Sequence, residues 1–134
     1  MSLDYSLLQP GREVSRKLVN LDLEAISAYL EAVGDESLLL SRNGDETFAP
    51  PMAIAAFSLR GILEELALPG GAVHGGQELS FDRAVPIGEP LQCSGTISQN
   101  SVRRAWRFLI VAVEANDHLG RKVMSGKATI MLPA

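Results

Sequence analysis

The sequence contains few of the residues from which catalytic and metal sites are usually built. It has one cysteine, Cys93, and two histidines, His74 and His118, among 134 residues. A single cysteine cannot form a disulfide within the chain, which favours a reducing compartment. Any acid–base or metal site that uses imidazole must use one of the two histidines. Cys93 alternates with apolar neighbours and is expected to be a small core residue rather than a nucleophile.

Basic residues and long apolar runs are also scarce. Twelve lysines and arginines are outnumbered by sixteen aspartates and glutamates, giving a net charge of −4. This balance argues against a nucleic-acid-binding surface. No apolar run reaches the length of about eighteen residues that a membrane helix requires, and no cleavable signal begins the sequence. We therefore expect no nucleic-acid partner, no membrane partner and a cytoplasmic location.

The composition itself is that of a folded domain. Hydrophobic residues make up 46% of the chain and charged residues 21%, which are proportions typical of a globular protein. The length suits one domain, and neither a repeat nor a low-complexity linker divides the chain. The sequence therefore predicts a single domain over residues 1–134.

The first half of the sequence predicts one strand and two helices. Asp22 is a suitable N-cap for the first helix, in which apolar residues recur at helical spacing until Gly34. Pro51 suits the first position of the second helix, whose opening turns are apolar on most sides and therefore predicted to be buried. The expected elements are a strand over residues 13–19, a helix over 23–33, a loop over 35–48 and a helix over 52–66.

The second half predicts extended structure. Apolar and polar residues alternate along it, as in half-buried strands, and the turn-forming residues 116–120 indicate a hairpin. The expected strands cover residues 77–85, 91–98, 104–115 and 121–132. Together the patterns predict an α+β fold in which a sheet of about five antiparallel strands, most of them in a meander, wraps around the buried second helix.

Several segments resemble the MaoC-like hydratases and dehydratases. Residues 23–35 are similar to the opening helix and Gly-Asp turn of that family, and residues 81–91 resemble its strand, turn and Gly-Asp-x-Leu strand start. Residues 49–51 and 74–77 are similar to the variant found as an N-terminal MaoC-like dehydratase domain. The resemblance covers nearly the whole chain. It implies a hotdog fold, in which a curved antiparallel sheet wraps a long central helix and edge strands form dimers.

The resemblance also implies a chemistry. Members of the family add water to a trans-2-enoyl thioester on CoA or acyl carrier protein, or catalyse the reverse dehydration. An Asp and a His hold and deprotonate the water, while a backbone N–H at the start of the central helix polarises the thioester carbonyl. The implied ligand is thus a CoA or phosphopantetheine thioester without a further cofactor. The acidic turns at residues 34–36 and 44–46 lack a spacing that would converge on a metal, so none is expected.

Two positions of this family pattern hold residues of another kind. Asp35 stands at the position of the family's Asp, but Leu40 stands where the pattern has His. Pro51 stands where active members often have a glycine that donates its N–H, and proline has none. The first-turn N–H of Met52 or Ala53 is the available substitute. The sequence therefore predicts thioester binding without the complete catalytic pair.

The remaining candidates lie in the second half of the chain. His74 follows a Pro-Gly-Gly turn, where a histidine usually faces solvent, yet it is the histidine expected to approach the central helix or a partner's cavity. His118 is expected at the surface of a hairpin turn. The basic cluster Arg103, Arg104 and Arg107 predicts either a solvated edge or a dock for CoA phosphates or an acidic carrier protein. The candidate site residues are Asp35 and His74 for catalysis and Leu40, Pro51, Met52, Ala53, Gly75, Gly76 and Arg83 for substrate binding.

Three functions remain open at this point. The first is a noncatalytic acyl-thioester-binding protein that acts as the partner of a complete MaoC-like subunit, with small alanines on the central helix leaving room for an acyl chain. The second is an active hydratase or dehydratase that uses Asp35 with His74 or a rearranged water. The third is a thioesterase, because the hotdog fold hosts that activity too. A homodimer, or a heterodimer with a second hotdog subunit, is expected because the sheet has edges to cover.

Overall fold

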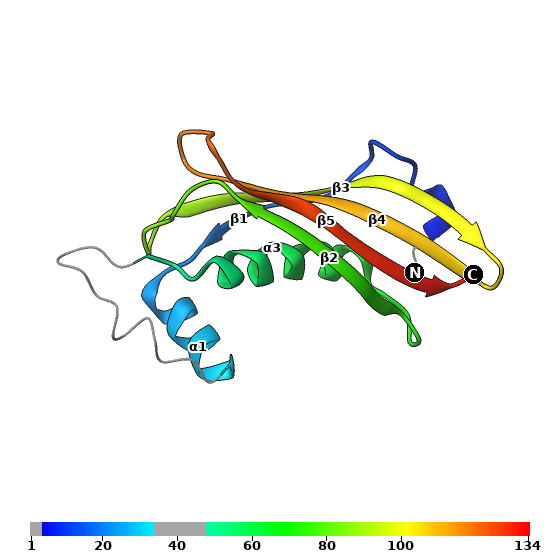
Figure 1. The fold of residues 1–134 in the computed structure, drawn as a ribbon, viewed down its shortest axis with the longest axis horizontal. Helices are drawn as coiled ribbons and strands as arrows, with labels where there is room; N and C mark the ends of the chain where they lie inside the picture. Colours follow the sequence, from blue (N-terminus) through cyan, green and yellow to red (C-terminus); the bar gives the residue numbers. More distant parts are fainter. Residues whose placement is uncertain (1–3, 34–47) are drawn as a thin grey trace.

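The computed structural model of the chain describes residues 4–33 and 48–134. It confirms the α+β class, with a five-stranded antiparallel sheet that curves over one long helix (Figure 1). The predicted loop over residues 35–48 falls, except for Phe48, outside the described residues. Neither helix is long and apolar enough to cross a membrane over these two ranges. The elements are η1 (Tyr5–Leu7), β1 (Glu13–Asn20), α1 (Leu23–Val33), α3 (Pro51–Leu66), β2 (Val73–Phe81), β3 (Pro90–Arg103), β4 (Trp106–Asn116) and β5 (Lys122–Pro133).

The helix α1 has the predicted bounds and the predicted cap. The N–H of Ala25 donates to the Asp22 side chain at 2.8 Å, and the N–H of Ile26 donates to the Asp22 carbonyl at 3.0 Å. These bonds satisfy two of the N–H groups that a helix start leaves free. Ile26 and Leu30 are buried on one side of the helix. Local sequence signals are therefore sufficient to define this element.

The helix α3 begins at Pro51, as predicted, and ends where Ala67 adopts a left-handed conformation with φ 46° and donates its N–H to the Leu63 carbonyl at 3.1 Å. The prediction that its first turns are buried on most sides is wrong in part. Pro51, Met52 and Ala56 are exposed, because the sheet covers the helix from one side only. The buried residues of α3 are Ala53, Ile54, Ala55, Ser58, Ile62 and Leu66.

The sheet order is β1-β3-β4-β5-β2. Strands β3, β4 and β5 form the predicted meander, but β2 pairs with β5 and not with the next strand in sequence, so the prediction of four consecutive neighbours is wrong. The connection after β2 crosses the end of the sheet. It is anchored by the Asp82 N–H, which donates to the Val123 carbonyl at 2.8 Å, and by the Gly88 N–H, which donates to the Leu21 carbonyl at 2.8 Å. A connection of this length allows the crossover, whereas a tight turn forces neighbours to pair.

The strand β3 is longer than its alternation predicts. Its register with β4 shifts at a bulge between Ile97 and Gln99, and pairing then continues to Arg103 opposite Trp106. Because a bulge moves the following side chains to the other face, the simple alternation ends there although the strand does not. The strand predicted to start at residue 104 is therefore wrong at its first two residues, which instead form the hairpin turn.

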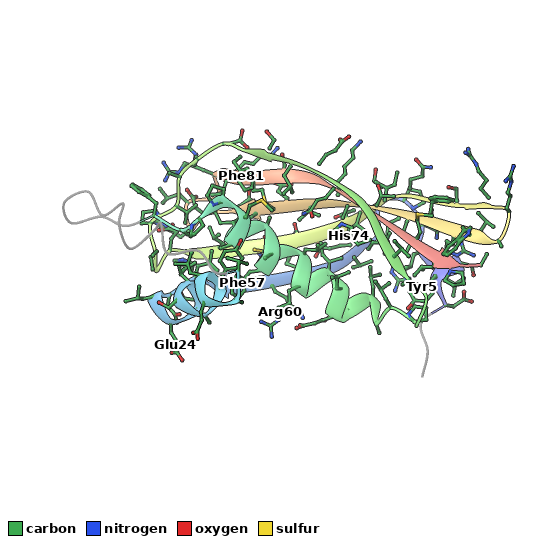
Figure 2. The ribbon with its side chains drawn as sticks, turned by 60° about the horizontal axis from the view of Figure 1, so that its bottom comes forward. Tyr5, Glu24, Phe57, Arg60, His74 and Phe81 are labelled. Carbon is green, nitrogen blue, oxygen red and sulfur yellow. The ribbon has the colours of Figure 1, made fainter. Side chains whose placement is uncertain are left out.

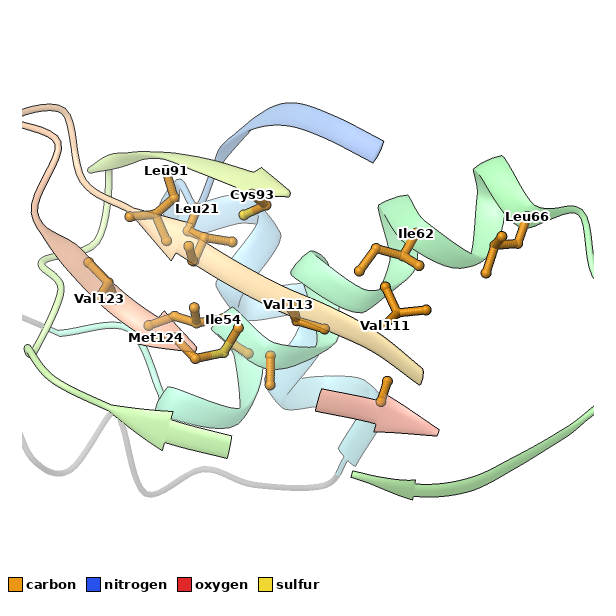
Figure 3. Close-up of a cluster of buried hydrophobic side chains, with 14 of the residues drawn as sticks. Leu21, Ile54, Ile62, Leu66, Leu91, Cys93, Val111, Val113, Val123 and Met124 are labelled. Carbon is orange, nitrogen blue, oxygen red and sulfur yellow. The ribbon is translucent and has the colours of Figure 1, made fainter. Parts of the chain in front are cut away.

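The core lies between α3 and the inner face of the sheet (Figure 3). At its centre Gly95 leaves space for Ile62, whose Cγ1 lies 2.5 Å from the position that a Cβ on Gly95 would occupy. Cys93 is buried beside Ser58, with 3.2 Å between Sγ and Oγ. Burial raises the pKa of this thiol, with the Ser58 hydrogen bond opposing it, so the thiol stays protonated. The prediction that Cys93 is a core residue is confirmed.

The N-terminal segment closes the end of the core beneath the C-terminus of α3. The Tyr5 hydroxyl lies 2.7 Å from the Leu66 carbonyl and 2.8 Å from the Ala67 carbonyl. The Asn100 amide donates to the carbonyls of Tyr5 and Leu8, at 2.8 and 2.9 Å. The side chain of Leu8 is almost fully buried. The segment thus caps the carbonyl end of the helix through one phenol.

Removing that phenol gives a first prediction. Tyr5→Phe is expected to lower the free energy of unfolding by about 1 kcal/mol, the usual net value of one hydrogen bond. Denaturant unfolding followed by circular dichroism measures it. Tyr29→Phe is the matched control, because no described residue bonds the Tyr29 hydroxyl, and it should change stability by less than about 0.5 kcal/mol. Equal effects of the two substitutions contradict the capping role.

The edge strand β2 is exposed along nearly its whole length. Of its nine residues only Leu79 is partly buried, and α3 packs on β1, β3 and β4 instead. The predicted half-buried strand over residues 77–85 is therefore wrong in both its bounds and its burial. Val85 is buried, but it lies beyond the strand. One edge of the sheet and the inner face of that edge are left uncovered by the described part of this chain.

Candidate functional site

The start of α3 is tied to the connection between β2 and β3. The Ala49 N–H donates to the Val85 carbonyl at 2.7 Å, and Phe48 forms an isolated antiparallel bridge with Pro86. Two segments that are far apart in the sequence are thereby brought together at one end of the sheet. The first turn of the helix is held in place by backbone pairing rather than by a capping side chain.

One backbone donor at this helix start is unused by the described residues. The N–H groups of Ala53 and Ile54 lie 3.0 and 3.4 Å from the Pro50 carbonyl, and Pro51 has no N–H. No described residue accepts a hydrogen bond from the N–H of Met52, whose side chain is 54% exposed. The sequence left Met52 and Ala53 as alternative donors, and the structure favours Met52. This N–H lies at the positive end of a sixteen-residue helix.

An apolar ledge runs along the inner face of β2. The register places Phe81 opposite the buried Met124 and Leu79 opposite Gly126, so both side chains point to the side of the sheet that carries α3. Phe81 is 37% exposed and Leu79 is half-buried. We call Leu79 and Phe81 the β2 ledge. It is the uncovered continuation of the core face toward the open edge of the sheet.

The alanines expected to leave room for an acyl chain have different surroundings. Ala49, Ala53 and Ala55 are packed in the core, each with 5% or less of its surface exposed. Ala56 is exposed. The expectation of free space is therefore wrong for three of the four positions, because neighbouring side chains fill the volume that small residues leave.

A hollow of about 400 Å³ lies at the end of the sheet, beside the connection that holds α3. Arg83 is exposed and lines it, as do side chains of the β4–β5 turn. Its charged residues carry both signs, so it is not a purely basic pocket. The lining residues are Asp82, Arg83, Ala84, Val85, Pro86, Glu89, Asp117, His118, Arg121 and Val123.

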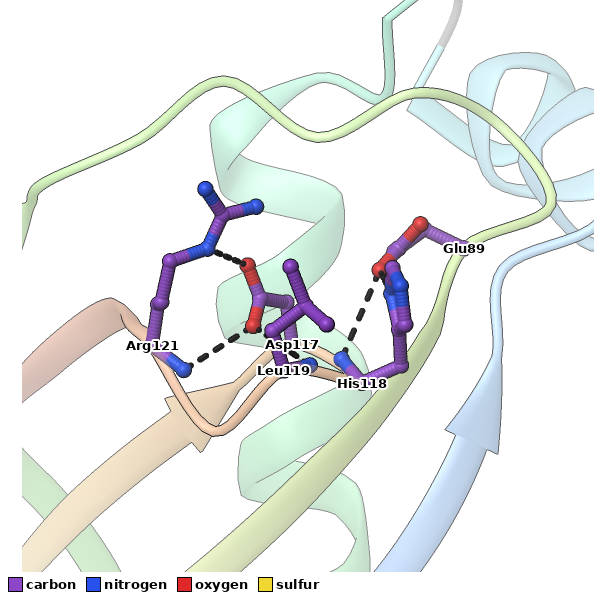
Figure 4. A network of polar contacts seen from close by, with 5 residues as sticks. All are labelled: Glu89, Asp117, His118, Leu119 and Arg121. Carbon is purple, nitrogen blue, oxygen red and sulfur yellow. Dashed lines mark hydrogen bonds and ion pairs between the residues drawn. The ribbon is translucent and has the colours of Figure 1, made fainter.

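The β4–β5 turn at the rim of this hollow is held by Asp117 (Figure 4). Its carboxylate accepts hydrogen bonds from the Leu119 N–H at 3.0 Å, the Arg121 N–H at 2.9 Å and the Arg121 Nε at 2.8 Å. Burial raises the pKa of Asp117, but these bonds outweigh it and the pKa is lowered overall. His118 is exposed, as predicted, and its Nδ1 pairs with Glu89. Sequence reasoning missed that pair because the two residues are distant in the chain.

The lowered pKa of Asp117 gives a second prediction. The ionised carboxylate contributes stability that is fully present above the ordinary aspartate pKa of about 4 and is lost as the pH falls through the lower folded-state pKa. Asp117→Asn should therefore reduce the urea midpoint at neutral pH, and the difference from the wild type should shrink toward about pH 2. Urea titrations at both pH values test this. A difference that does not depend on pH contradicts the role of the charge.

Of the predicted catalytic pair, only His74 lies among the described residues. His74 lies opposite Ile130 and Phe81 opposite Met124, so His74 and Phe81 are seven residues apart along β2, or about 23 Å at the rise of a strand. In Figure 2 His74 lies nearer to the C-terminal half of α3 than to the start of that helix. Gly75 and Gly76 adjoin His74, at a bulge in the register with β5. Asp35 and Leu40 lie outside the described residues.

Comparison with known proteins gives one family and one fold. A model of the FAS1-like dehydratase domain region matches residues 9–126, and no curated protein matches significantly. The monoamine oxidase regulatory protein from Archaeoglobus fulgius is similar over 98% of this chain and 95% of its own, with 11% identity and a TM-score of 0.81. Unliganded R-hydratase PhaJ1 from Pseudomonas aeruginosa is similar over 98% of this chain and 86% of its own, with 21% identity and a TM-score of 0.78. A chain of the C-terminally truncated HadBC complex (3R-hydroxyacyl-ACP dehydratase) from Mycobacterium tuberculosis is similar over 93% of this chain and 99% of its own, with 18% identity and a TM-score of 0.70.

Proposed function

The chain belongs to the family of the FAS1-like dehydratase domain region, and from this membership we propose that it binds acyl thioesters as a noncatalytic subunit of a hotdog dimer. The resemblance to MaoC-like proteins and the hotdog fold are both confirmed. The ligand is the thioester of CoA or acyl carrier protein, bound at the start of α3. The observation that carries the proposal is the Met52 N–H, to which no described residue is hydrogen-bonded, together with the uncovered edge strand β2.

Thioester binding is supported by the chemistry of this helix start. A thioester carbonyl needs a fixed donor, and the helix dipole adds favourable potential at the N-terminus. The Met52 N–H supplies such a donor, and Ala56 supplies a small exposed position one turn later on the same helix. The β2 ledge offers apolar surface for the acyl chain. Arg83, at the nearby hollow, is the candidate contact for a phosphate of the carrier group.

The noncatalytic role is supported by what stands at the family's catalytic positions. Leu40 cannot act as a base, and Pro51 cannot donate an N–H. His74 lies about 23 Å along β2 from Phe81, which is the last residue of that strand. Asp35 can orient a water, but the imidazole that shares the proton transfer in the family pattern is replaced by Leu40. Binding therefore has more support in this chain than turnover.

The two edges of the sheet differ in a way that supports pairing through β2. The edge strand β1 carries Glu13, Arg16 and Lys17, and the Lys17 ammonium is held by Glu64 and Glu65 of α3 at 3.2 and 3.3 Å. Charges along an edge discourage pairing with another chain. The strand β2 has one charged residue and an uncovered inner face. A second hotdog subunit on this edge would extend the sheet and cover the β2 ledge.

The hydrogen bonds between β2 and β5 determine which backbone groups of β2 face the open edge. The Asp82 N–H donates to the Val123 carbonyl of β5, so residues of the same parity in β2 face β5. Gln77, Leu79 and Phe81 therefore direct their N–H and carbonyl groups outward. HadBC, a complex described as a 3R-hydroxyacyl-ACP dehydratase, is among the similar structures. It supports a partner that is a second, different hotdog subunit.

One observation favours the active hydratase as a second candidate. If β2 pairs antiparallel with β2 of a second copy, the start of one strand lies beside the end of the other. His74 of the second copy then approaches Phe81 and the start of α3, and it could take the proton of a water that adds to C3 of an enoyl thioester while C2 gains a proton. A homodimer is thus a precondition of that activity.

Hydration of crotonyl-CoA distinguishes the proposals. We expect the purified protein to bind crotonyl-CoA but to hydrate it no faster than buffer, and we expect activity when a hotdog subunit that keeps both Asp and His is added. Turnover by the protein alone, lost in Asp35→Asn and in His74→Ala, overturns the noncatalytic role. Release of free thiol from acyl-CoA indicates the thioesterase instead. Absence of binding overturns the proposal altogether.

A further inference from the structure

A basic cluster lies at the end of the sheet that is remote from the start of α3. The chain has a net charge of −4, yet it has three arginines in the five residues of the β3–β4 hairpin, Arg103 to Arg107, and no acidic residue between Leu91 and Val113. This hairpin lies at the end of the sheet where η1 and the end of β5 are found (Figure 1). The sequence predicted either a solvated edge or a phosphate dock here.

The arginines of this hairpin are not neutralised by the fold. Arg103 and Arg104 are exposed, and neither has a carboxylate partner among residues 4–33 and 48–134. By contrast, Arg16, Arg60 and Arg121 each form an ion pair. Arg107 is engaged differently, donating to the Asn100 side chain at 2.8 Å. Two guanidinium groups are therefore available to an anion.

The turn itself retains a charged residue at an unfavourable position. Arg104 has φ 59° and is the first of the two residues between the paired Arg103 and Trp106. A two-residue hairpin that needs a positive φ there is usually built with glycine. An arginine at such a position keeps a guanidinium at the tip of the hairpin at the expense of backbone strain.

A hollow of about 180 Å³ adjoins Arg103 on the outer face of the sheet. Phe108 and Ile110 form its apolar part and are both half-buried. Neutral donors and acceptors surround them, and the Gln99 amide donates to the Ser101 hydroxyl at 3.3 Å, which leaves the Gln99 carbonyl oxygen unused in that bond. Arg103 closes one side. The lining residues are Gln99, Ser101, Arg103, Phe108, Ile110 and Thr129.

We propose that this hollow binds the base of a nucleotide whose phosphates are held by Arg103 and Arg104. A nucleobase has flat apolar faces that stack on aromatic side chains and a polar edge that exchanges hydrogen bonds. Phe108 suits the face, Gln99 and Ser101 suit the edge, and guanidinium groups suit phosphate. The same chemistry is offered by the adenosine bisphosphate end of CoA and by a free nucleotide such as ATP. The site is on the outer face, opposite α3, and does not rest on the proposed function.

The single tryptophan provides the measurement. Trp106 is 37% exposed and pairs with Arg103, so a bound base should change its fluorescence. The full-length protein is titrated with CoA, adenosine 3′,5′-bisphosphate, ATP and pantetheine, with calorimetry as a second readout. We expect saturable binding of one or more of the three nucleotides and none of pantetheine. Preference for CoA and the bisphosphate identifies the CoA nucleotide as the source, and preference for ATP identifies a free nucleotide.

Three variants test the residues. Arg103→Ser and Arg104→Gly should each weaken nucleotide binding by about tenfold, and glycine at residue 104 also relieves the positive φ, so the hairpin stays folded. Arg16→Ser removes the same charge from β1 and should leave the affinity unchanged. No saturable binding of any nucleotide overturns the proposal. So does an equal loss of affinity in Arg16→Ser.

Discussion

Replacing Gly126 by alanine is expected to detach β2 from the sheet. A Cβ on Gly126 would lie 2.0 Å from the Glu78 carbonyl oxygen and 3.0 Å from Leu79 Cδ2. The oxygen belongs to the backbone of β2, so it cannot move aside without breaking the pairing with β5. We expect the free energy of unfolding to fall by about 3 kcal/mol, the upper part of the range for overpacking. Urea unfolding and amide exchange of β2 measure the two effects.

Gly70→Ala is the control for this substitution. No atom lies within 4 Å of a Cβ at Gly70, and its φ is not in the left-handed region. Its stability should stay within about 0.5 kcal/mol of the wild type. If Gly126→Ala also leaves the stability unchanged, β2 does not approach β5 as closely as described. If amide protection is lost throughout the sheet and not first in β2, the edge strand does not unfold separately from the rest of the sheet.

Proline in β2 is expected to weaken dimerisation when it replaces Gln77 and to weaken folding when it replaces Glu78. The N–H of Gln77 faces the open edge, so Gln77→Pro keeps the pairing with β5 but blocks the edge to another strand. We expect a folded monomer and a dimer dissociation constant raised by about tenfold for each edge N–H that is lost, which is about 100-fold when both strands of a symmetric dimer carry the proline. Sedimentation velocity over a concentration series measures the association. Binding at the start of α3 should weaken with it if the β2 ledge is covered by the partner.

The neighbouring residue provides the contrast. The N–H of Glu78 faces β5, so Glu78→Pro removes a bond of the existing sheet and should lower the free energy of unfolding by about 3 kcal/mol. Gln77→Ala keeps the edge N–H and should behave as the wild type in both respects. Association that survives Gln77→Pro, whether with a second copy or with the added hotdog subunit, means that the dimer uses another surface.

The elements that sequence predicted well are those defined by neighbouring residues. Asp22 caps α1 as its side chain and position suggested. The hairpin over residues 116–120 follows from its turn composition, and Cys93 follows from alternation. The failures occur where long-range pairing overrides local pattern. The alternation around Phe81 indicated a half-buried strand, but burial of that face depends on what packs against it, and α3 lies elsewhere.

The candidate site shows the same division. The leucine at residue 40, where the family pattern has histidine, and the proline at residue 51 are visible in the sequence. Under the family resemblance they are the basis for proposing a noncatalytic role. The choice of Met52 as the available donor is not visible, because it depends on the bonds from Ala53 and Ile54 to the Pro50 carbonyl. The separation of His74 from the helix start likewise depends on the register of β2.

By itself the sequence determined the fold class, the family resemblance and the local starts and ends of the helices, because these depend on side-chain type and spacing within a few residues. Only the tertiary structure decided that β2 pairs with β5. It also decided that charged residues lie along the β1 edge while the β2 edge is uncovered by the described residues. It placed Arg103 and Phe108 around the same hollow. These features join residues that are far apart in the chain. Their energies come from contacts made after folding, which no local pattern records.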